Sequence, residues 1–112
     1  MIEQIMLSSR HLLSPFESYN EIIPNLWLGN LKSCYDDDFL KKKKIKAIVS
    51  LYTPFLKKQH FLEKNIAVYQ IKITDNISLK SNLLLYNQLD SINIFINNFL
   101  KKNIAVLIHC HY

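Results

Sequence analysis

The chain alternates short apolar runs with one long stretch in which apolar and polar positions follow a helical period. That stretch covers residues 82–102, where apolar residues recur at steps of four and three and predict a helix with one continuous stripe. The stripe consists of Leu85, Leu89, Ile92, Ile96 and Phe99. Other apolar residues widen this surface, so we expect the helix to be largely buried between a sheet and other helices.

Short apolar runs over residues 45–52 and 104–108 predict buried strands, and the alternation of apolar and polar residues over 66–73 predicts a further strand. The last run is uninterrupted, which is typical of a central strand in a parallel sheet, because both faces of such a strand are covered. Residues 21–29 predict one more strand, broken near Pro24. Since proline lacks a donor for the ladder, we place this strand at an edge of the sheet.

Residues 31–44 predict a helix with three aspartates toward its start and four lysines at its end. This order of charges complements the helix dipole. A spacing of four also pairs Asp37 with Lys41 and Asp38 with Lys42 across helical turns. Cys34 is interpreted as a packed residue of this helix.

Strands that alternate with helices predict an α/β domain with a mostly parallel central sheet flanked by helices. A second short helix is predicted over residues 55–64. The 112 residues suffice for one domain and not for two. Residues 1–20 lack a clear period and are expected to form an N-terminal arm, with a short helix over 5–13, whereas residues 21–112 form the domain.

The formal net charge is +5, and part of it comes from short lysine runs. Such runs are either solvated helix ends or a source of attraction to phosphorylated and other anionic partners. We expect no specific nucleic-acid partner, because neither zinc-finger spacing nor an aromatic RNA-binding motif accompanies the lysines. The sequence indicates no oligomeric state.

Two cysteines in a chain of this size do not make a disulfide framework. The first 20 residues do not read as a signal peptide, and no window approaches the roughly 18 apolar residues of a membrane span. We therefore expect an intracellular protein, in the cytoplasm, without a membrane partner.

The strongest chemical signal is the apolar run 104–108 leading into His109 and Cys110. Open α/β sheets bind ligands at the carboxyl ends of their strands. A loop and a helix N-terminus placed after the strand would form an anion site and lower the pKa of the thiol. This placement suits phosphoryl transfer through a cysteine. The alternative interpretation of Cys110 is a small buried core residue.

Four segments, in this order, resemble the dual-specificity branch of the cysteine-dependent protein-tyrosine phosphatases. They are IIPNLWLGN at 22–30, IKAIVSL at 45–51, IKITDN at 71–76 and VLIHC at 106–110. The resemblance covers residues 21–112 and implies a phosphatase-like α/β fold. It also implies hydrolysis of phosphotyrosine and of phosphoserine or phosphothreonine in protein substrates, through a phosphocysteine intermediate and with no cofactor.

By this resemblance Cys110 is the nucleophile, Asp75 is the general acid, and His109 supports the thiolate. Asp75 also fits a turn or a helix cap, positions that aspartate favours. A zinc site at His109, Cys110 and His111 is not expected, because alternate strand residues face opposite sides and no second cluster supplies ligands.

The family's signature continues with a glycine directly after the position of Tyr112, then an arginine three residues later. Neither is among the 112 residues, and the family's last helices are missing too. We therefore expect a domain cut off inside its active-site signature, with no phosphate-binding residue, an ordinary Cys110 thiol and no activity of its own. The alternatives are a non-catalytic binding or decoy module and a rhodanese-like thiol protein.

Overall fold

A five-stranded sheet forms the centre of the computed structural model, which describes residues 18–51, 56–71 and 79–109, the side chains of 79–87 excepted. The strand order is β1-β2-β5-β3-β4. β1 pairs antiparallel with β2, whereas all other neighbours pair parallel. The strands are β1 Tyr19–Ile23, β2 Leu26–Gly29, β3 Ile45–Ser50, β4 Ala67–Gln70 and β5 Ala105–His109. The predicted α/β class with a mostly parallel sheet is confirmed.

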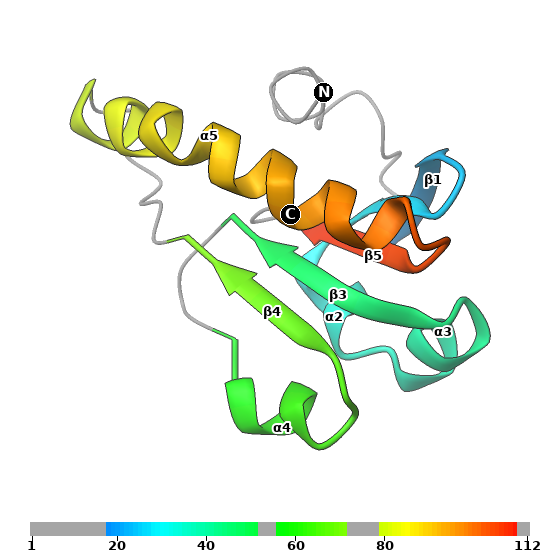
Figure 1. Cartoon of the computed structure of the whole chain (residues 1–112). Helices are drawn as coiled ribbons and strands as arrows, with labels where there is room; N and C mark the ends of the chain where they lie inside the picture. The colour runs from blue at the N-terminus through cyan, green and yellow to red at the C-terminus, as the bar shows by residue number, and fades with distance from the viewer. Residues whose placement is uncertain (1–17, 52–55, 72–78, 110–112) are drawn as a thin grey trace.

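Helices cover both faces of this sheet (Figure 1). The long helix α5, Leu79–Leu100, lies across one face, and three short helices pack on the other. The short helices are α2 Leu31–Cys34, α3 Asp37–Lys42 and α4 Lys58–Leu62. No helix in the described part of the chain is long and apolar enough to cross a membrane.

The side chains of the central strands alternate between two cores, one on each face of the sheet. Val49 and Ile108 belong to the core beneath α5, together with Ile92 and Ile96 of that helix. The residues between them point the other way: Ile48 and Leu107 pack with side chains from α3 and α4. β3 and β5 are therefore covered on both faces, as their continuous apolar sequences predicted.

The predicted strand over residues 21–29 is wrong in form, because this segment is a hairpin of β1 and β2. The chain turns at Pro24 and Asn25, and Asn25 adopts a left-handed backbone with φ 67°. Asparagine tolerates this conformation better than most residues. The first strand also begins at Tyr19, two residues before the predicted start. β1 occupies the sheet edge, whereas β2 lies between β1 and β5.

The predicted helix over residues 31–44 is also corrected, since α2 and α3 are separated at Tyr35 and Asp36. The side chain of Asp36 accepts a hydrogen bond from the Phe39 amide at 3.1 Å and so begins a new helix. The ion pair of Asp37 is with Lys64, at 2.8 Å, instead of the predicted partner Lys41. The aspartates of this segment therefore supply a helix cap, at Asp36, and a tertiary contact to the turn after α4, at Asp37.

The long helix matches its prediction closely, beginning at Leu79 and ending at Leu100. Ile92 and Ile96 of the predicted stripe are fully buried. Ile94, however, is 62% exposed, so the expectation of burial between a sheet and further helices is wrong for its side of the helix. The predicted N-terminal helix over residues 5–13 lies outside the described residues.

Candidate active site

Three strands have their carboxyl ends side by side at the place where the chemical motif begins. The Cα atom of His109, the last residue of β5, is in register with Gly29 of β2 and with Ser50 of β3. All five residues of β5 are buried, and His109 and Ser50 are both 0% exposed. The carboxyl ends of parallel strands therefore meet at His109, which is where ligands of open α/β sheets bind.

The imidazole of His109 is held by a buried hydrogen bond. Its Nε2 atom lies 2.7 Å from Oγ of Ser50, on the neighbouring strand. Nε2 of Gln70 in turn donates to Ser50 Oγ at 3.4 Å, and Oε1 of Gln70 accepts from the Leu56 amide at 3.1 Å. A chain of polar contacts thus runs from β4 through β3 to β5.

The contact between Ser50 and His109 fixes the position of the histidine ring. A serine hydroxyl can both donate and accept, so the direction of this hydrogen bond depends on the tautomer of His109. A buried polar group is costly unless it is hydrogen-bonded, so the ring is held against Ser50 in either tautomer.

At the same carboxyl ends, backbone hydrogen bonds continue as far as His109, the last residue before the motif cysteine. The amide of Leu51 donates to the carbonyl of His109 at 3.0 Å, so β5 stays in the ladder as far as His109. The amide of Ile71 likewise donates to the carbonyl of Ser50 at 2.9 Å. The segments that lead into Cys110 and toward Asp75 therefore both start from fixed points at the carboxyl ends of the parallel strands.

Of the predicted site residues, the structure places His109 at the carboxyl end of β5. Cys110, His111 and Asp75 lie outside the described residues. Within the part of the chain that is described, no group of three or more His, Cys, Asp or Glu side chains is arranged to hold a metal ion.

Cys34 is the other cysteine, and its surroundings make it an inert thiol. Its side chain is 0% exposed within the core that also holds α3 and α4. Burial raises the pKa of the Cys34 thiol far above its ordinary value, because the thiolate would lose its hydration. The interpretation of Cys34 as a packed helix residue is confirmed.

Ser50 and Gln70 take part in the site without having been predicted from the sequence. Ser50 ends the run IKAIVS, in which it is the one buried polar residue. A serine at the carboxyl end of a buried strand needs a partner, and this was the available signal. The identity of that partner, 59 residues further along the chain, follows only from the strand order.

No family model matches the chain, and no curated protein sequence matches it. Solved structures do match. Human DUSP28 has a TM-score of 0.64 at 15% identity, covering 88% of this chain and 62% of its own. A leucine rich repeat and phosphatase domain protein from Entamoeba histolytica has a TM-score of 0.62 at 17% identity, covering 83% and 55%.

A third match is the core catalytic domain of the PP-IP phosphatase SIW14 from S. cerevisiae. Its TM-score is 0.59 at 22% identity, and the alignment covers 88% of this chain and 58% of SIW14. The chain thus spans less than two thirds of the length of each of these structures. Identities this low speak for the fold, and the chain therefore has the fold of the dual-specificity and protein-tyrosine phosphatases.

Proposed function

We propose that Cys110 is the nucleophile of a cysteine-dependent phosphatase acting on phosphotyrosine and on phosphoserine or phosphothreonine in proteins. The observation that carries this proposal is the buried, Ser50-bonded His109 at the carboxyl end of the central strand β5. Cys110 follows it directly in the sequence, and the sheet has the fold of known phosphatases. A nucleophile needs such a fixed point of attachment to meet phosphorus in line.

In the proposed reaction the thiolate of Cys110 attacks phosphorus, and the bond from phosphorus to the leaving oxygen breaks. Asp75 donates its proton to that oxygen. Asp75, now a carboxylate, then takes a proton from the water that attacks the phosphocysteine. The sulfur–phosphorus bond breaks, which releases inorganic phosphate and returns the thiolate.

The reach of the chain supports the role of Asp75. Asp75 follows the buried Ile71 by four residues, and four residues of extended chain span at most about 14 Å. β4 is separated from β5 only by β3, so two strand spacings, roughly 10 Å, lie between them. An acid in the segment after β4 is therefore within reach of a substrate held at Cys110.

His109 is proposed to act through position. Its ring is bonded to Ser50 and its carbonyl to Leu51, so the direction in which the chain leaves β5 is fixed. In this way His109 and Ser50 would hold the sulfur of Cys110 at the mouth of the site, with Gln70 supporting Ser50 from β4.

The 112 residues by themselves are proposed to be inactive. Their only arginine is Arg10, and no residue after Tyr112 is present to supply the loop amides that bind a phosphate. Removing even one donor that stabilises charge in a transition state typically costs about 2.7–4 kcal/mol. The loss of an arginine fork together with several amides would remove measurable turnover.

Turnover of p-nitrophenyl phosphate tests both parts of this proposal. The purified 112-residue chain is expected to show none, and Cys110-dependent turnover by it would refute the proposed inactivity. A second protein continues the chain after Tyr112 with the segment of human DUSP28 that follows the position equivalent to Tyr112. This graft is expected to turn over substrate, and its Cys110→Ser variant is not. A folded graft with equal activity in both forms would refute the role of Cys110.

A rhodanese-like thiol protein is the rival enzyme class. The phosphatase fold of the three neighbours favours phosphate chemistry over sulfur transfer. Transfer of sulfur from thiosulfate by the graft, dependent on Cys110, would overturn the proposal. The three structural neighbours are not named for one shared substrate, so the substrate class proposed for this chain rests on the sequence resemblance.

A further inference from the structure

A concave site lies at the opposite end of the parallel strands from His109. It is a depression of about 200 Å³ beside the start of β3. Its walls come from α3, from the first residues of β3 and from the turn that follows α4. The lining residues are Asp37, Leu40, Lys41, Ile45, Lys46, Lys64 and Ile66.

The floor of the depression is aliphatic. Leu40, Ile45 and Ile66 are 4%, 1% and 5% exposed and belong to the core on the α3 side of the sheet. Above this floor stand three lysines, whose methylene stems extend the apolar surface while their ammonium groups reach water. The site therefore combines a small apolar base with a cationic rim.

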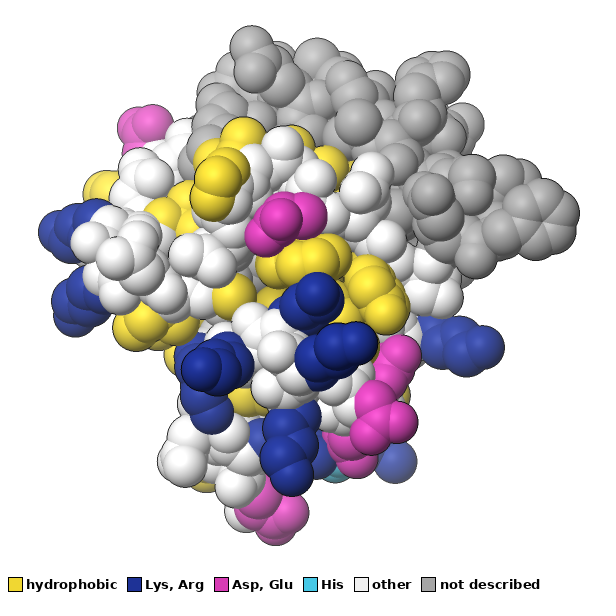
Figure 2. Space-filling view, turned by 90° about the vertical axis from the view of Figure 1, so that its right-hand side faces the viewer, with side chains coloured by type: hydrophobic (Ala, Val, Ile, Leu, Met, Phe, Trp, Pro, Cys, Tyr) yellow, Lys and Arg dark blue, Asp and Glu magenta, His cyan; other side chains and the backbone are white. Residues whose placement is uncertain are grey.

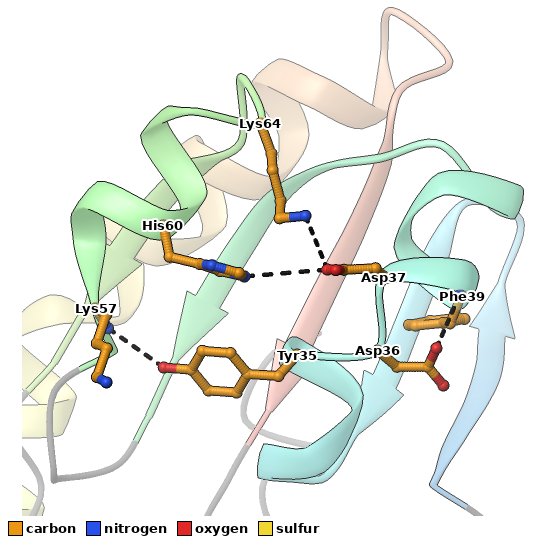
Figure 3. Close-up of polar contacts among 7 residues, drawn as sticks. All are labelled: Tyr35, Asp36, Asp37, Phe39, Lys57, His60 and Lys64. Carbon is orange, nitrogen blue, oxygen red and sulfur yellow. Dashed lines mark hydrogen bonds and ion pairs between the residues drawn. The ribbon is translucent and has the colours of Figure 1, made fainter.

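One of the three lysines is already paired. Nζ of Lys64 lies 2.8 Å from Oδ1 of Asp37, and His60 approaches the same oxygen at 4.0 Å (Figure 3). Tyr35 adds a second bridge to this region, since its hydroxyl oxygen accepts from the Lys57 amide at 3.3 Å. These contacts hold α4 and the turn after it against α3, so the walls of the depression are fixed relative to each other.

The other two lysines of the rim are available to a partner. Within the described ranges, neither Lys41 nor Lys46 has an ion-pair partner. Lys43 is engaged differently, with its ammonium 5.4 Å from the centroid of the Trp27 ring. Figure 2, which looks at the end of the molecule where α3 lies, shows lysine side chains grouped around apolar ones, with acidic side chains beside them. The field at this end therefore attracts negative charge.

We propose that this depression, lined by Lys41, Lys46 and Leu40, is a docking site for an acidic peptide segment of a partner protein. One aliphatic side chain of the segment enters the depression, and flanking carboxylates pair with Lys41 and Lys46. This complementarity of an apolar anchor and opposite charges gives specificity and a rapid, salt-sensitive encounter. The site does not depend on the proposed phosphatase activity, because it lies at the other end of the strands.

The shape and lining favour a peptide over other anionic partners. A volume of about 200 Å³ is below the roughly 300–1,000 Å³ of pockets for cofactor-sized ligands. The lining holds no aromatic ring on which a nucleobase could stack, and Asp37 would repel a phosphate backbone. A membrane would need apolar side chains that protrude, whereas these three are buried beneath the lysines.

Fluorescence anisotropy with the full 112-residue chain tests the proposal. The probe is a fluorescein-labelled heptapeptide with one central leucine between glutamates and aspartates. The double variant Lys41→Glu/Lys46→Glu is expected to weaken binding about tenfold, since each exposed pair is lost and replaced by repulsion. The matched double variant Lys101→Glu/Lys102→Glu changes net charge equally outside the depression, and it is expected to shift affinity less than twofold.

Two further changes separate docking from general attraction. Asp37→Asn removes the negative charge of the rim and releases Lys64, so it is expected to tighten binding about twofold to threefold. Replacement of the peptide's leucine by glycine is expected to weaken it several-fold. Circular dichroism of each variant, compared with the parent chain, verifies that the fold is retained.

Several outcomes would overturn the proposal. Equal weakening by the two lysine double variants would reduce the effect to net charge. No response to loss of the leucine would remove the aliphatic anchor. Tighter binding of single-stranded DNA or of phosphatidylserine vesicles, abolished by Lys41→Glu/Lys46→Glu, would assign the site to one of those partners instead. Absence of peptide binding at low salt by the folded chain would refute the site.

Discussion

At the carboxyl ends of β3 and β5, polar side chains are buried and bonded to one another: Ser50 and His109 are fully buried, and Gln70 extends their contact to β4. At the amino end of β3, by contrast, Lys41 and Lys46 stand on an exposed rim above an aliphatic floor. A buried polar chain is expensive unless complete, so it holds groups in place. Exposed charges have little effect on folding stability and instead attract oppositely charged molecules in solution.

The two ends of the parallel strands should therefore respond differently to substitution. Substitutions at the carboxyl end should act on folding and on the position of the next residue in the chain. Substitutions at the amino end should change stability little and act on binding.

His109→Ala is expected to destabilise the chain by about 3 kcal/mol, because it leaves a cavity in the core and removes the partner of Ser50. Lys46→Ala, at the other end of β3, is the matched control and should change stability by no more than about 0.5 kcal/mol. Urea unfolding followed by circular dichroism measures both. Equal effects of the two substitutions would erase the proposed difference between the ends.

Ser50→Ala is expected to cost about 2 kcal/mol, because Nε2 of the buried His109 loses the hydroxyl that holds it. The double variant Ser50→Ala/His109→Ala should be more stable than the sum of the single effects predicts, by about 1 kcal/mol. A double-mutant cycle from urea unfolding gives this coupling. Strict additivity would mean that the 2.7 Å contact contributes nothing in solution.

Gly29→Ala probes the carboxyl end of β2, beside His109, and is expected to cost about 1–2 kcal/mol. A Cβ atom at this position would collide with Oγ of Ser33 and lie 3.0 Å from a methyl group of Leu107. Ser33 cannot easily move, because its hydroxyl donates to the Asn30 carbonyl at 2.6 Å. The double variant Gly29→Ala/Ser33→Ala should regain part of the loss in thermal unfolding, and no regain would contradict this steric account.

The smallest effect is expected at the exposed ion pair of the amino end. The hydrogen bond from Lys64 lowers the pKa of Asp37 below its ordinary value, so Lys64→Met should raise that pKa toward the ordinary value. Because the folded-state pKa of Asp37 is depressed, the pair stabilises the folded chain fully at pH values above the unfolded-state pKa. That contribution is lost as the pH falls through the folded-state pKa. A carboxyl NMR titration of both chains checks the shift, and identical pKa values would show that the pair does not form.

The order of the strands and helices could be predicted from local sequence patterns, whereas the positions at which one element ends and the next begins could not. The apolar runs that became β3 and β5 and the stripe that became α5 each carry their own period. The segment IIPNLWLG carries no period that separates one broken strand from a hairpin. The three consecutive aspartates were interpreted as charges within one helix, whereas the side chain of Asp36 accepts from the Phe39 amide and begins a second helix.

The candidate site was predictable only where it is local in sequence. His109 could be singled out because it ends an apolar run beside a cysteine. Its contact with Ser50 bridges 59 positions and exists only because β3 and β5 are neighbours in register. The ion pair of Asp37 with Lys64 likewise replaces the expected neighbour Lys41, because the fold brings a distant lysine closer than the local one.

We propose that the fixed carboxyl end of β5 presents Cys110 as the nucleophile of a phosphatase. The most direct test of this role is acid quenching and mass spectrometry of the chain continued with the human DUSP28 segment, carrying Asp75→Asn to slow breakdown of the intermediate. After p-nitrophenyl phosphate is added, a phosphoryl group is predicted on the peptide that contains Cys110. A folded, substrate-binding protein with no phosphoryl group on that peptide would contradict the account.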